Sequence, residues 1–162
     1  GFFKVYKTTK TSQISFLNKL GPEPFNKSFN IKYFIKFIKK RKKNIKNLLM
    51  DQTFVAGLGN IYVNEALFMS RIHPGRACYS LNKNEIKKLI LNIKKILKFS
   101  ISKEGASIKD FHNVSGKSGK FQQFFYVYGQ KNKKCSRISC TGKIKIIQIS
   151  NRSSFYCDKC QI

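Results

Sequence analysis

Four of the five cysteines gather near the C-terminus in the pattern Cys135-x4-Cys140-x16-Cys157-x2-Cys160. Two close pairs separated by a short segment can bring four thiolates within tetrahedral reach of one metal ion, as in structural zinc sites. The intervening letters, KIKIIQIS-NRSS-FYC, are typical of two strands joined by a turn. We therefore predict a small β hairpin closed by one structural Zn²⁺, whose ligands are Cys135, Cys140, Cys157 and Cys160.

Two disulfides or unpaired thiols are the alternatives to a metal at these cysteines. The N-terminal GFFKVYK is followed by no long apolar segment, so we expect no secretory signal and no oxidising compartment. Clustered cysteines in such a chain favour a metal. Four thiolates leave no coordination position open for water, so the site would be structural. Cys78 has no obvious partner and is expected to be a buried thiol.

The amino-acid composition indicates a packed protein with a polyanionic partner. Hydrophobic residues make up 41% and aromatic residues 14% of the chain, which is enough for a folded core. Lys and Arg number 33 against 7 Asp and Glu, and the net charge of +26 makes nucleic acid the first candidate partner. A biased base composition of the genome is the alternative cause of so many lysines. No apolar run approaches the ~20 residues that span a bilayer, so we expect no membrane association.

Helical periodicity dominates the middle of the chain. Apolar residues recur at helical spacing from Asn30 to Met50, with the basic run KKRKKNIK at 39–46 between them. The segment FVAGLG at 54–59 then predicts a tight turn, because glycines tolerate backbone conformations that other residues resist. NIYVNEALFMS resumes the helical spacing, and we expect Asn60 to cap this second helix.

The clearest helix is expected at 83–103. Asn82 and Glu85 form a capping-box pattern at its start, isoleucines and leucines recur on one face, and Gly105 is placed to end it. The polar stretch HNVSGKSGK at 112–120 predicts a flexible loop. The aromatic FQQFFYVYG that follows predicts a strand leading into the cysteines.

Two local features are suited to binding phosphate. The N–H groups of a glycine-containing turn at a helix N-terminus bind anions, and Asn60 can add a side-chain donor there. Arg152, at the predicted hairpin turn, can enter a DNA groove or clamp a phosphate with two hydrogen bonds. An ordinary helix connection and a solvated turn residue are the plainer alternatives. The basic run at 39–46 either lines the same phosphates or forms a solvated face.

Four segments together resemble the formamidopyrimidine-DNA glycosylase family of bacteria. They are LGPEP at 20–24, IKNLLMDQTFVAGLGNIYVNEALF at 45–68, IHPGR at 72–76 and FYCDKCQ at 155–161. The resemblance extends over nearly the whole chain from residue 20. The related endonuclease VIII enzymes share the helical and zinc parts, but LGPEP, LMDQ and GLGNIYVNE look more like the formamidopyrimidine branch.

The resemblance implies a mainly α fold with a small β zinc ribbon. It implies a helix–two-turn–helix DNA-binding domain over 21–125 and a zinc-finger β hairpin over 126–162. Residues 1–20 contain the strand-like runs FFKVYK and SQISFL, and are expected to be the remnant of an N-terminal catalytic β sandwich. The chain begins with Gly1 rather than Met, as expected of a fragment or a processed piece.

Enzymes of this family act in DNA base-excision repair. They remove oxidised purines such as 8-oxoguanine and formamidopyrimidines, cleave the strand at the abasic site, and flip the damaged nucleotide out of the helix. By position, the resemblance implies that Arg41, Lys46 and Asn60 grip phosphates near the lesion. It implies that Arg152 supports the backbone of the extruded nucleotide and donates a proton in the final elimination. The segment that closes over the flipped base would comprise Gly116, Lys117, Ser118, Gly119, Lys120 and Phe121.

The family's nucleophile does not occur in this sequence. It is the amino group of an N-terminal proline, followed by a glutamate and assisted by a lysine farther along the same domain, and the 162 residues contain none of the three. We therefore expect the parent protein to be a DNA glycosylase and abasic-site lyase, and this chain alone to bind DNA without removing bases. The widened first cysteine pair also departs from the family pattern, and is expected to leave zinc binding intact.

The expected partner is double-stranded damaged DNA, bound by a monomer associated with the nucleoid in the bacterial cytoplasm. The rival function is a non-catalytic zinc-ribbon module that binds nucleic acid. A decaying gene product is a third possibility, and it predicts no stable folded protein. An upstream reading frame beginning Met-Pro-Glu would favour the enzyme.

Overall fold

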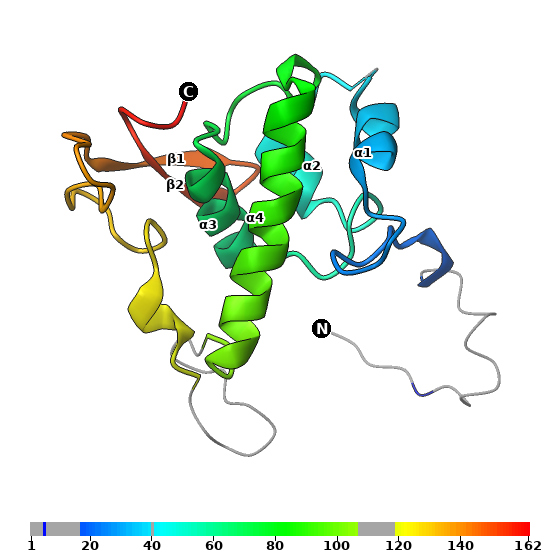
Figure 1. Cartoon of the computed structure of the whole chain (residues 1–162), viewed down its shortest axis with the longest axis horizontal. Coiled ribbons are helices and arrows are strands. Elements are labelled where there is room, and N and C mark those ends of the chain that lie inside the picture. The colour runs from blue at the N-terminus through cyan, green and yellow to red at the C-terminus, as the bar shows by residue number, and fades with distance from the viewer. Residues whose placement is uncertain (1–4, 6–16, 40, 107–118) are drawn as a thin grey trace.

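A computed structural model describes residues 5, 17–39, 41–106 and 119–162. Helices form most of the ordered structure, and an antiparallel two-stranded hairpin follows them, which confirms the predicted fold class (Figure 1). The strand-like runs predicted within residues 1–16 lie outside the described residues, Val5 apart. Within the described segments, no helix is both long enough and apolar enough to cross a bilayer. In chain order the elements are η2 (Leu17–Lys19), α1 (Ile31–Ile38), α2 (Ile45–Met50), α3 (Asn60–Ser70), η3 (Cys78–Ser80), α4 (Lys83–Ser102), η4 (Phe121–Phe124), β1 (Ile144–Ile149) and β2 (Arg152–Cys157).

The helical stretch predicted from Asn30 to Met50 is divided into two helices. Asn30 precedes α1, and its side-chain oxygen accepts a hydrogen bond from the backbone N–H of Tyr33 at 3.0 Å. Asn44 precedes α2 and accepts from the N–H of Asn47 at 2.8 Å. A capping residue has an extended backbone, and Asn44 has a ψ of 157°, so α1 cannot continue into α2.

Helix α4 has the predicted start and end. The side chain of Asn82 accepts from the N–H of Glu85 at 3.0 Å, and the Glu85 carboxylate accepts from the N–H of Asn82 at 2.9 Å, which confirms the capping box. At the other end Gly105 has a φ of +82°, and its N–H bonds the carbonyl of Ser100 at 2.9 Å. The buried face of α4 consists of Ile86, Leu89, Ile90, Ile93, Ile96 and Ser100.

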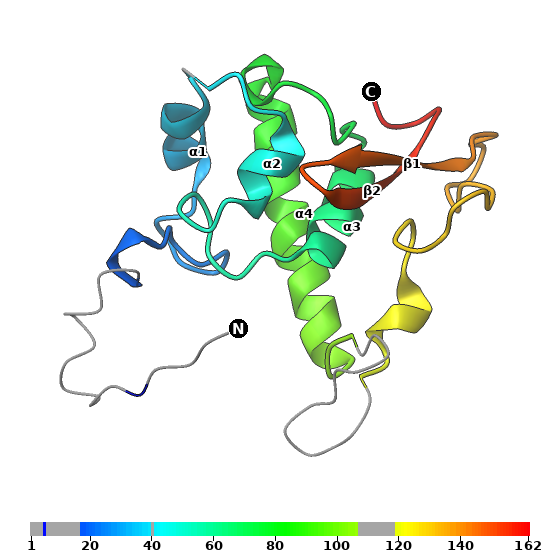
Figure 2. The same cartoon turned by 180° about the vertical axis from the view of Figure 1, so that it is seen from behind.

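Helix α3 is the centre of the molecule. It packs against α4 on one side and against β2 on the other, so that α4 and the hairpin cover opposite sides of the fold (Figures 1 and 2). The turn that leads into α3 is fixed by Phe54, whose buried ring contacts those of Phe29, Phe34 and Phe37. The hydroxyl of Tyr33 donates to the carbonyl of Phe54 at 2.8 Å. This packing positions the glycine-containing turn and the start of α3.

The strand predicted for FQQFFYVYG is wrong. Phe121 to Phe124 form the short 3-10 helix η4, and the chain then turns without pairing to a strand. The rings of Phe121 and Phe125 contact each other and belong to the helical core. Aromatic content favours strands, but here it reflects packing against α3 and α4.

The capping role of Asn82 at the start of α4 can be tested by mutation. Replacing Asn82 by Ala (Asn82→Ala) removes the acceptor for the Glu85 N–H, so the free energy of unfolding is expected to fall by about 1 kcal/mol in urea titrations. The matched control is Asn84→Ala, two residues further in an exposed position of the same turn. Equal losses in the two variants would contradict the capping role.

Candidate nucleic-acid interface and metal centre

The four clustered cysteines bring their sulfur atoms together in one compact group. The Sγ atoms of Cys135 and Cys160 are 3.8 Å apart, those of Cys140 and Cys157 are 3.7 Å apart, and all four lie within 4.8 Å of one another. A tetrahedral thiolate site with metal–sulfur bonds of ~2.3 Å has sulfur–sulfur separations of about 3.8 Å. A disulfide would need about 2.05 Å. The cluster therefore fits a bound metal ion and not two disulfides.

The hairpin and its flanking turns hold the cysteines in place. Strands β1 and β2 pair from Ile144 with Cys157 to Ile149 with Arg152. Cys135, the first cysteine of the cluster, donates its backbone N–H to the carbonyl of Gly142 at 2.8 Å. Gly142 has no space for a side chain, because an added Cβ would lie 2.6 Å from the Cys157 Sγ.

Two polar side chains attach the metal module, which comprises the hairpin and the four cysteines, to the helical body. The buried Gln161 accepts from the N–H of Cys157 at 2.9 Å and donates to the carbonyl of Ile72 at 2.8 Å. Arg137, within the wide first pair, stacks its guanidinium 4.4 Å from the ring of Phe68 and donates to the Phe68 carbonyl at the end of α3. The wider spacing therefore includes a residue that anchors the loop.

Lys46 and Asn60, both predicted to grip phosphates, converge on the backbone carbonyl of Ser153 in β2. The buried Lys46 ammonium donates to this carbonyl at 3.0 Å and to the Ser154 hydroxyl at 2.6 Å. The Asn60 amide donates to the same carbonyl at 3.2 Å. Burial, followed by the positive charge of Arg152, lowers the pKa of Lys46 to about 8. The structure thus brings α2, the start of α3 and the hairpin tip together at one point.

The prediction that Asn60 caps α3 is wrong. Gly59 is the capping residue and Asn60 is the first residue of the helix. The Asn60 side chain is therefore free to reach the hairpin instead of its own backbone. Asn64, one turn later, donates to the Asn60 carbonyl at 2.7 Å and accepts from the N–H of Phe155 at 2.7 Å.

Arg152 is the first residue of β2 and directly follows the two-residue turn, whereas the sequence prediction placed it in the turn itself. The turn residues Ser150 and Asn151 have φ values of 47° and 59°, as a two-residue type I′ turn requires. Arg152 is exposed and directly precedes Ser153, so its guanidinium belongs to the same region as Lys46. Arg41 makes different contacts: its guanidinium lies 3.9 Å from the ring centre of Phe37.

The predicted lesion-capping segment is described only in part. Gly116, Lys117 and Ser118 lie outside the described residues. Gly119, Lys120 and Phe121 fasten the segment to the end of α4, since the N–H groups of Lys120 and Phe121 donate to the carbonyls of Lys103 and Gly105 at 2.9 and 3.0 Å. The Phe121 ring is buried and stacks on Tyr62. Phe121 is thus an anchor of this segment in the structure, and a capping function for the segment stays a prediction.

Sequence reasoning assigned no role to Glu65, although it lies within the GLGNIYVNE motif. Its fully buried carboxylate accepts three backbone hydrogen bonds, from Tyr126 at 2.9 Å, Val127 at 3.1 Å and Tyr128 at 2.9 Å. Burial raises the pKa of Glu65, and the three N–H donors oppose that rise. Asn64 and Gln161 were missed as well. The available signal was a polar side chain within an otherwise apolar segment, which indicates an internal hydrogen bond.

Cys78 was expected to be a buried thiol, and the structure confirms this expectation. Cys78 is fully buried, its Sγ lies 3.1 Å from the carbonyl of Arg41, and burial raises the pKa of its thiol. A raised pKa disfavours the thiolate, which is the form that attacks electrophiles and binds metals. Cys78 is therefore a structural thiol.

From the cysteine cluster we expect the chain to bind one metal ion per molecule, measured by mass spectrometry of the native protein and by colorimetric release. Cys157→Ser should abolish stoichiometric binding, and chelation of the metal should unfold the hairpin because its few buried residues cannot stabilise it alone. Cys78→Ser is the control, since this thiol is outside the cluster. A Cys157→Ser variant that retains a full equivalent would contradict the assignment.

Comparison with known proteins agrees with this arrangement. Residues 20–112 match the model of the formamidopyrimidine-DNA glycosylase H2TH domain. The formamidopyrimidine-DNA glycosylase of Prochlorococcus marinus is 45% identical over 151 residues, which are 93% of this chain and 53% of that protein. The chain spans about half the length of the curated relatives that it matches.

Solved structures give the same result. The Lactococcus lactis Fpg in complex with abasic-site DNA matches with a TM-score of 0.87 and 37% identity, over 96% of this chain and 56% of that chain. A mutant of the same protein in complex with Fapy-dG DNA matches with a TM-score of 0.86 and 36% identity, over 96% of this chain and 56% of that chain. The chain described here belongs to the formamidopyrimidine-DNA glycosylase family.

Proposed function

We propose that this chain is the DNA-holding part of a base-excision repair glycosylase, and that Arg152, Lys46 and Asn60 contact the phosphates that flank a damaged nucleotide. One observation carries the proposal. The carbonyl of Ser153 gathers the Lys46 ammonium and the Asn60 amide directly beside Arg152. Residues from three separate elements thus converge beside the exposed Arg152 on a protein with a net charge of +26.

The chemistry of these donors suits a phosphodiester. A guanidinium matches two phosphate oxygens, and hydrogen bonds between charged groups are stronger than neutral ones. The N-terminus of α3 adds backbone N–H groups and a favourable dipole, and its first turn contains no acidic residue. Lys46 has a second role, because it also holds the hairpin tip through Ser153 and Ser154.

Zinc is the metal that we propose for the four cysteines. Four thiolates in tetrahedral geometry suit Zn²⁺, which has no open position in such a site and takes no part in catalysis. Cys157 ends the strand that Arg152 begins. The ion would therefore fix the strand that carries Arg152.

Base removal and strand cleavage are proposed for the whole enzyme. The solved relatives that contain Fapy-dG and abasic-site DNA support an oxidised purine as substrate and an abasic site as intermediate. The proline amine that the family resemblance implies as nucleophile lies outside these 162 residues, so we propose that the chain alone binds damaged duplex DNA without excising bases. Arg152 would support the extruded nucleotide and donate a proton in the elimination. Arg41 would contact a phosphate farther along the strand, and the segment 116–121 would cover the flipped base.

A non-catalytic nucleic-acid-binding module is the second candidate, and the same basic surface favours it. Borohydride trapping on an 8-oxoguanine duplex separates the two functions. A covalent adduct is expected only with the chain extended upstream to its start codon, and both forms should bind DNA. If neither form traps while both bind, the glycosylase proposal fails and the binding module takes its place.

Affinity for the same duplex tests the interface itself. Arg152→Ala removes a charged hydrogen-bond donor, so Kd is expected to rise by about tenfold to a hundredfold in fluorescence anisotropy titrations. Lys95→Ala removes one exposed positive charge from α4, on the opposite side of the fold, and serves as the control. Equal losses in both variants would mean that net charge alone drives binding.

The pKa of Lys46 predicts a pH dependence of DNA binding. Below its pKa of about 8 the side chain is an ammonium, and above it the charge is lost. A bound phosphate stabilises the ammonium, so the midpoint in the complex lies at or above this value. We expect affinity to decrease between pH 7 and pH 9.5, and the slope of log Kd against log salt to fall by roughly one. Lys46→Met should bind more weakly at pH 7 and lack this step, whereas Lys95→Met should retain it.

A further inference from the structure

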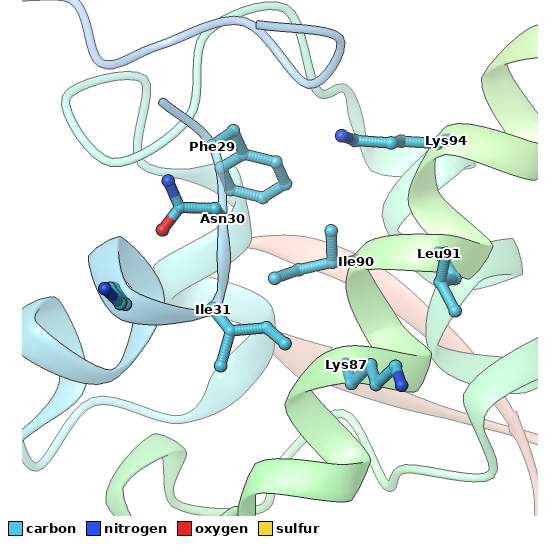
Figure 3. Close-up of a pocket in the computed structure, with 8 residues that line it drawn as sticks. Phe29, Asn30, Ile31, Lys87, Ile90, Leu91 and Lys94 are labelled. Atoms are coloured by element: carbon cyan, nitrogen blue, oxygen red, sulfur yellow. The ribbon is translucent and has the colours of Figure 1, made fainter. Parts of the chain in front are cut away.

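A groove lies between the start of α1 and the middle of α4 (Figure 3). Its volume is about 560 Å³, and it opens to solvent. Phe29, Asn30 and Ile31 form one wall, while Ile90 and Leu91 come from α4. The described residues that line it include no carboxylate, and its charged members are Lys32, Lys87 and Lys94.

The groove combines an apolar floor with a basic rim. Leu91 is 58% exposed in the middle of α4 and contributes accessible aliphatic surface to the groove, whereas Ile101, the other exposed large aliphatic residue of this helix, lies near its end and outside the groove. Lys87 and Lys94 are separated by two helical turns, or about 10 Å, and Ile90 and Leu91 lie between them (Figure 3). Neither these two lysines nor Lys32 forms a salt bridge with a carboxylate of the described residues.

This groove is separate from the nucleic-acid interface. Helix α4 and the hairpin lie on opposite sides of α3, so the groove belongs to a face from which Arg152 and Ser153 are remote (Figures 1 and 2). The protein can therefore bind a ligand in the groove and DNA at the hairpin at the same time. The function of the groove is not explained by the proposed DNA contacts.

Charge limits what can occupy the groove. A second copy of the chain carries a net charge of +26 and would be repelled. The chain's own N-terminal residues 1–16 contain three lysines and no acidic residue, and residues 107–118 contain two lysines and one aspartate. Duplex DNA would pair its phosphates with the lysines but would leave the apolar floor uncovered, and single-stranded nucleic acid favours exposed rings on which its bases stack. Among the described residues that line the groove, Phe29 is the one aromatic residue and is 1% exposed, so the accessible floor is aliphatic.

We propose that the groove binds an acidic peptide segment of another protein, in which an apolar side chain is flanked by carboxylates. The apolar residue would cover Leu91 and Ile90, and the carboxylates would pair with Lys87 and Lys94. Burial of aliphatic surface would provide the affinity, and the two lysines would determine the charge of the peptide and the spacing of its carboxylates. Through this contact an acidic partner would recruit the protein while its DNA interface stays open.

The test uses the zinc-loaded chain and a short fluorescein-labelled peptide with one phenylalanine between pairs of aspartates. Fluorescence anisotropy at about 150 mM salt screens long-range attraction. The double variant Lys87→Ala/Lys94→Ala is expected to weaken binding about tenfold, and Leu91→Asn about fivefold or more. The matched controls on the same helix are Lys95→Ala/Lys98→Ala and Ile101→Asn, which change exposed residues outside the groove. Two further controls are Arg152→Ala in the protein and replacement of the phenylalanine in the peptide by alanine. Together, the controls distinguish binding at the groove from general electrostatic attraction.

The proposal is supported if the groove variants lose affinity, their controls and Arg152→Ala retain it, and the alanine peptide binds weakly. It is overturned if the two double-lysine variants lose affinity equally, because the peptide would then sense net charge alone. It is also overturned if the peptide does not bind. A single-stranded oligonucleotide that displaces the peptide, and whose affinity falls in the same groove variants, would overturn it too, because the groove would then be a nucleic-acid surface. Loss of binding in a form extended upstream to its start codon would show that the rest of the polypeptide covers the groove, and would overturn it as well.

Discussion

The buried carboxylate of Glu65 is the interaction on which the C-terminal half of the molecule depends. It satisfies three successive backbone N–H groups, from Tyr126 to Tyr128, in a segment that forms no regular structure. An unpaired N–H group in the interior costs free energy, and a segment with three of them could not remain buried without an acceptor. One side chain of α3 thus replaces the sheet that the aromatic sequence would otherwise require. It also fixes the point where the chain leaves the helical body for the metal module.

The remaining ties between the two parts start from the same helix. Asn60 and Asn64 bond the backbone of β2, and the carbonyl of Phe68 accepts from Arg137 in the metal-binding loop. Helix α3 is therefore an organising element that is buried on nearly every side, with amide and carboxylate groups in place of part of the usual apolar surface. Such polar contacts are directional, so they select one orientation of the hairpin where apolar packing alone would tolerate several.

Local patterns predicted the local structures well. The metal-ligand spacing of the cysteines, the two strands between them and the capping box of α4 each depend on residues close in sequence, and the structure contains all three. The errors concern interactions between distant residues. Asn60 has the properties of a cap, but Ser153, far along the chain, takes its amide donor. The aromatic run after residue 120 has strand composition, but Glu65 and the core of α3 and α4 determine its conformation. The role of Lys46 was implied by family resemblance, and no spacing rule would have indicated that its ammonium is buried against the hairpin.

The hairpin tip has a consequence for the thermodynamics of recognition. Ser150 and Asn151 both occupy the left-handed region, which residues other than glycine adopt at a steric cost, and the strands on either side are held in register. The backbone of Arg152 is further held by the contacts that Ser153 makes with Lys46 and Asn60. Conformational entropy at the tip is therefore lost when the protein folds and not when a ligand arrives. An arginine on a mobile loop would have to be ordered in each binding event, whereas this one needs only its side chain to settle.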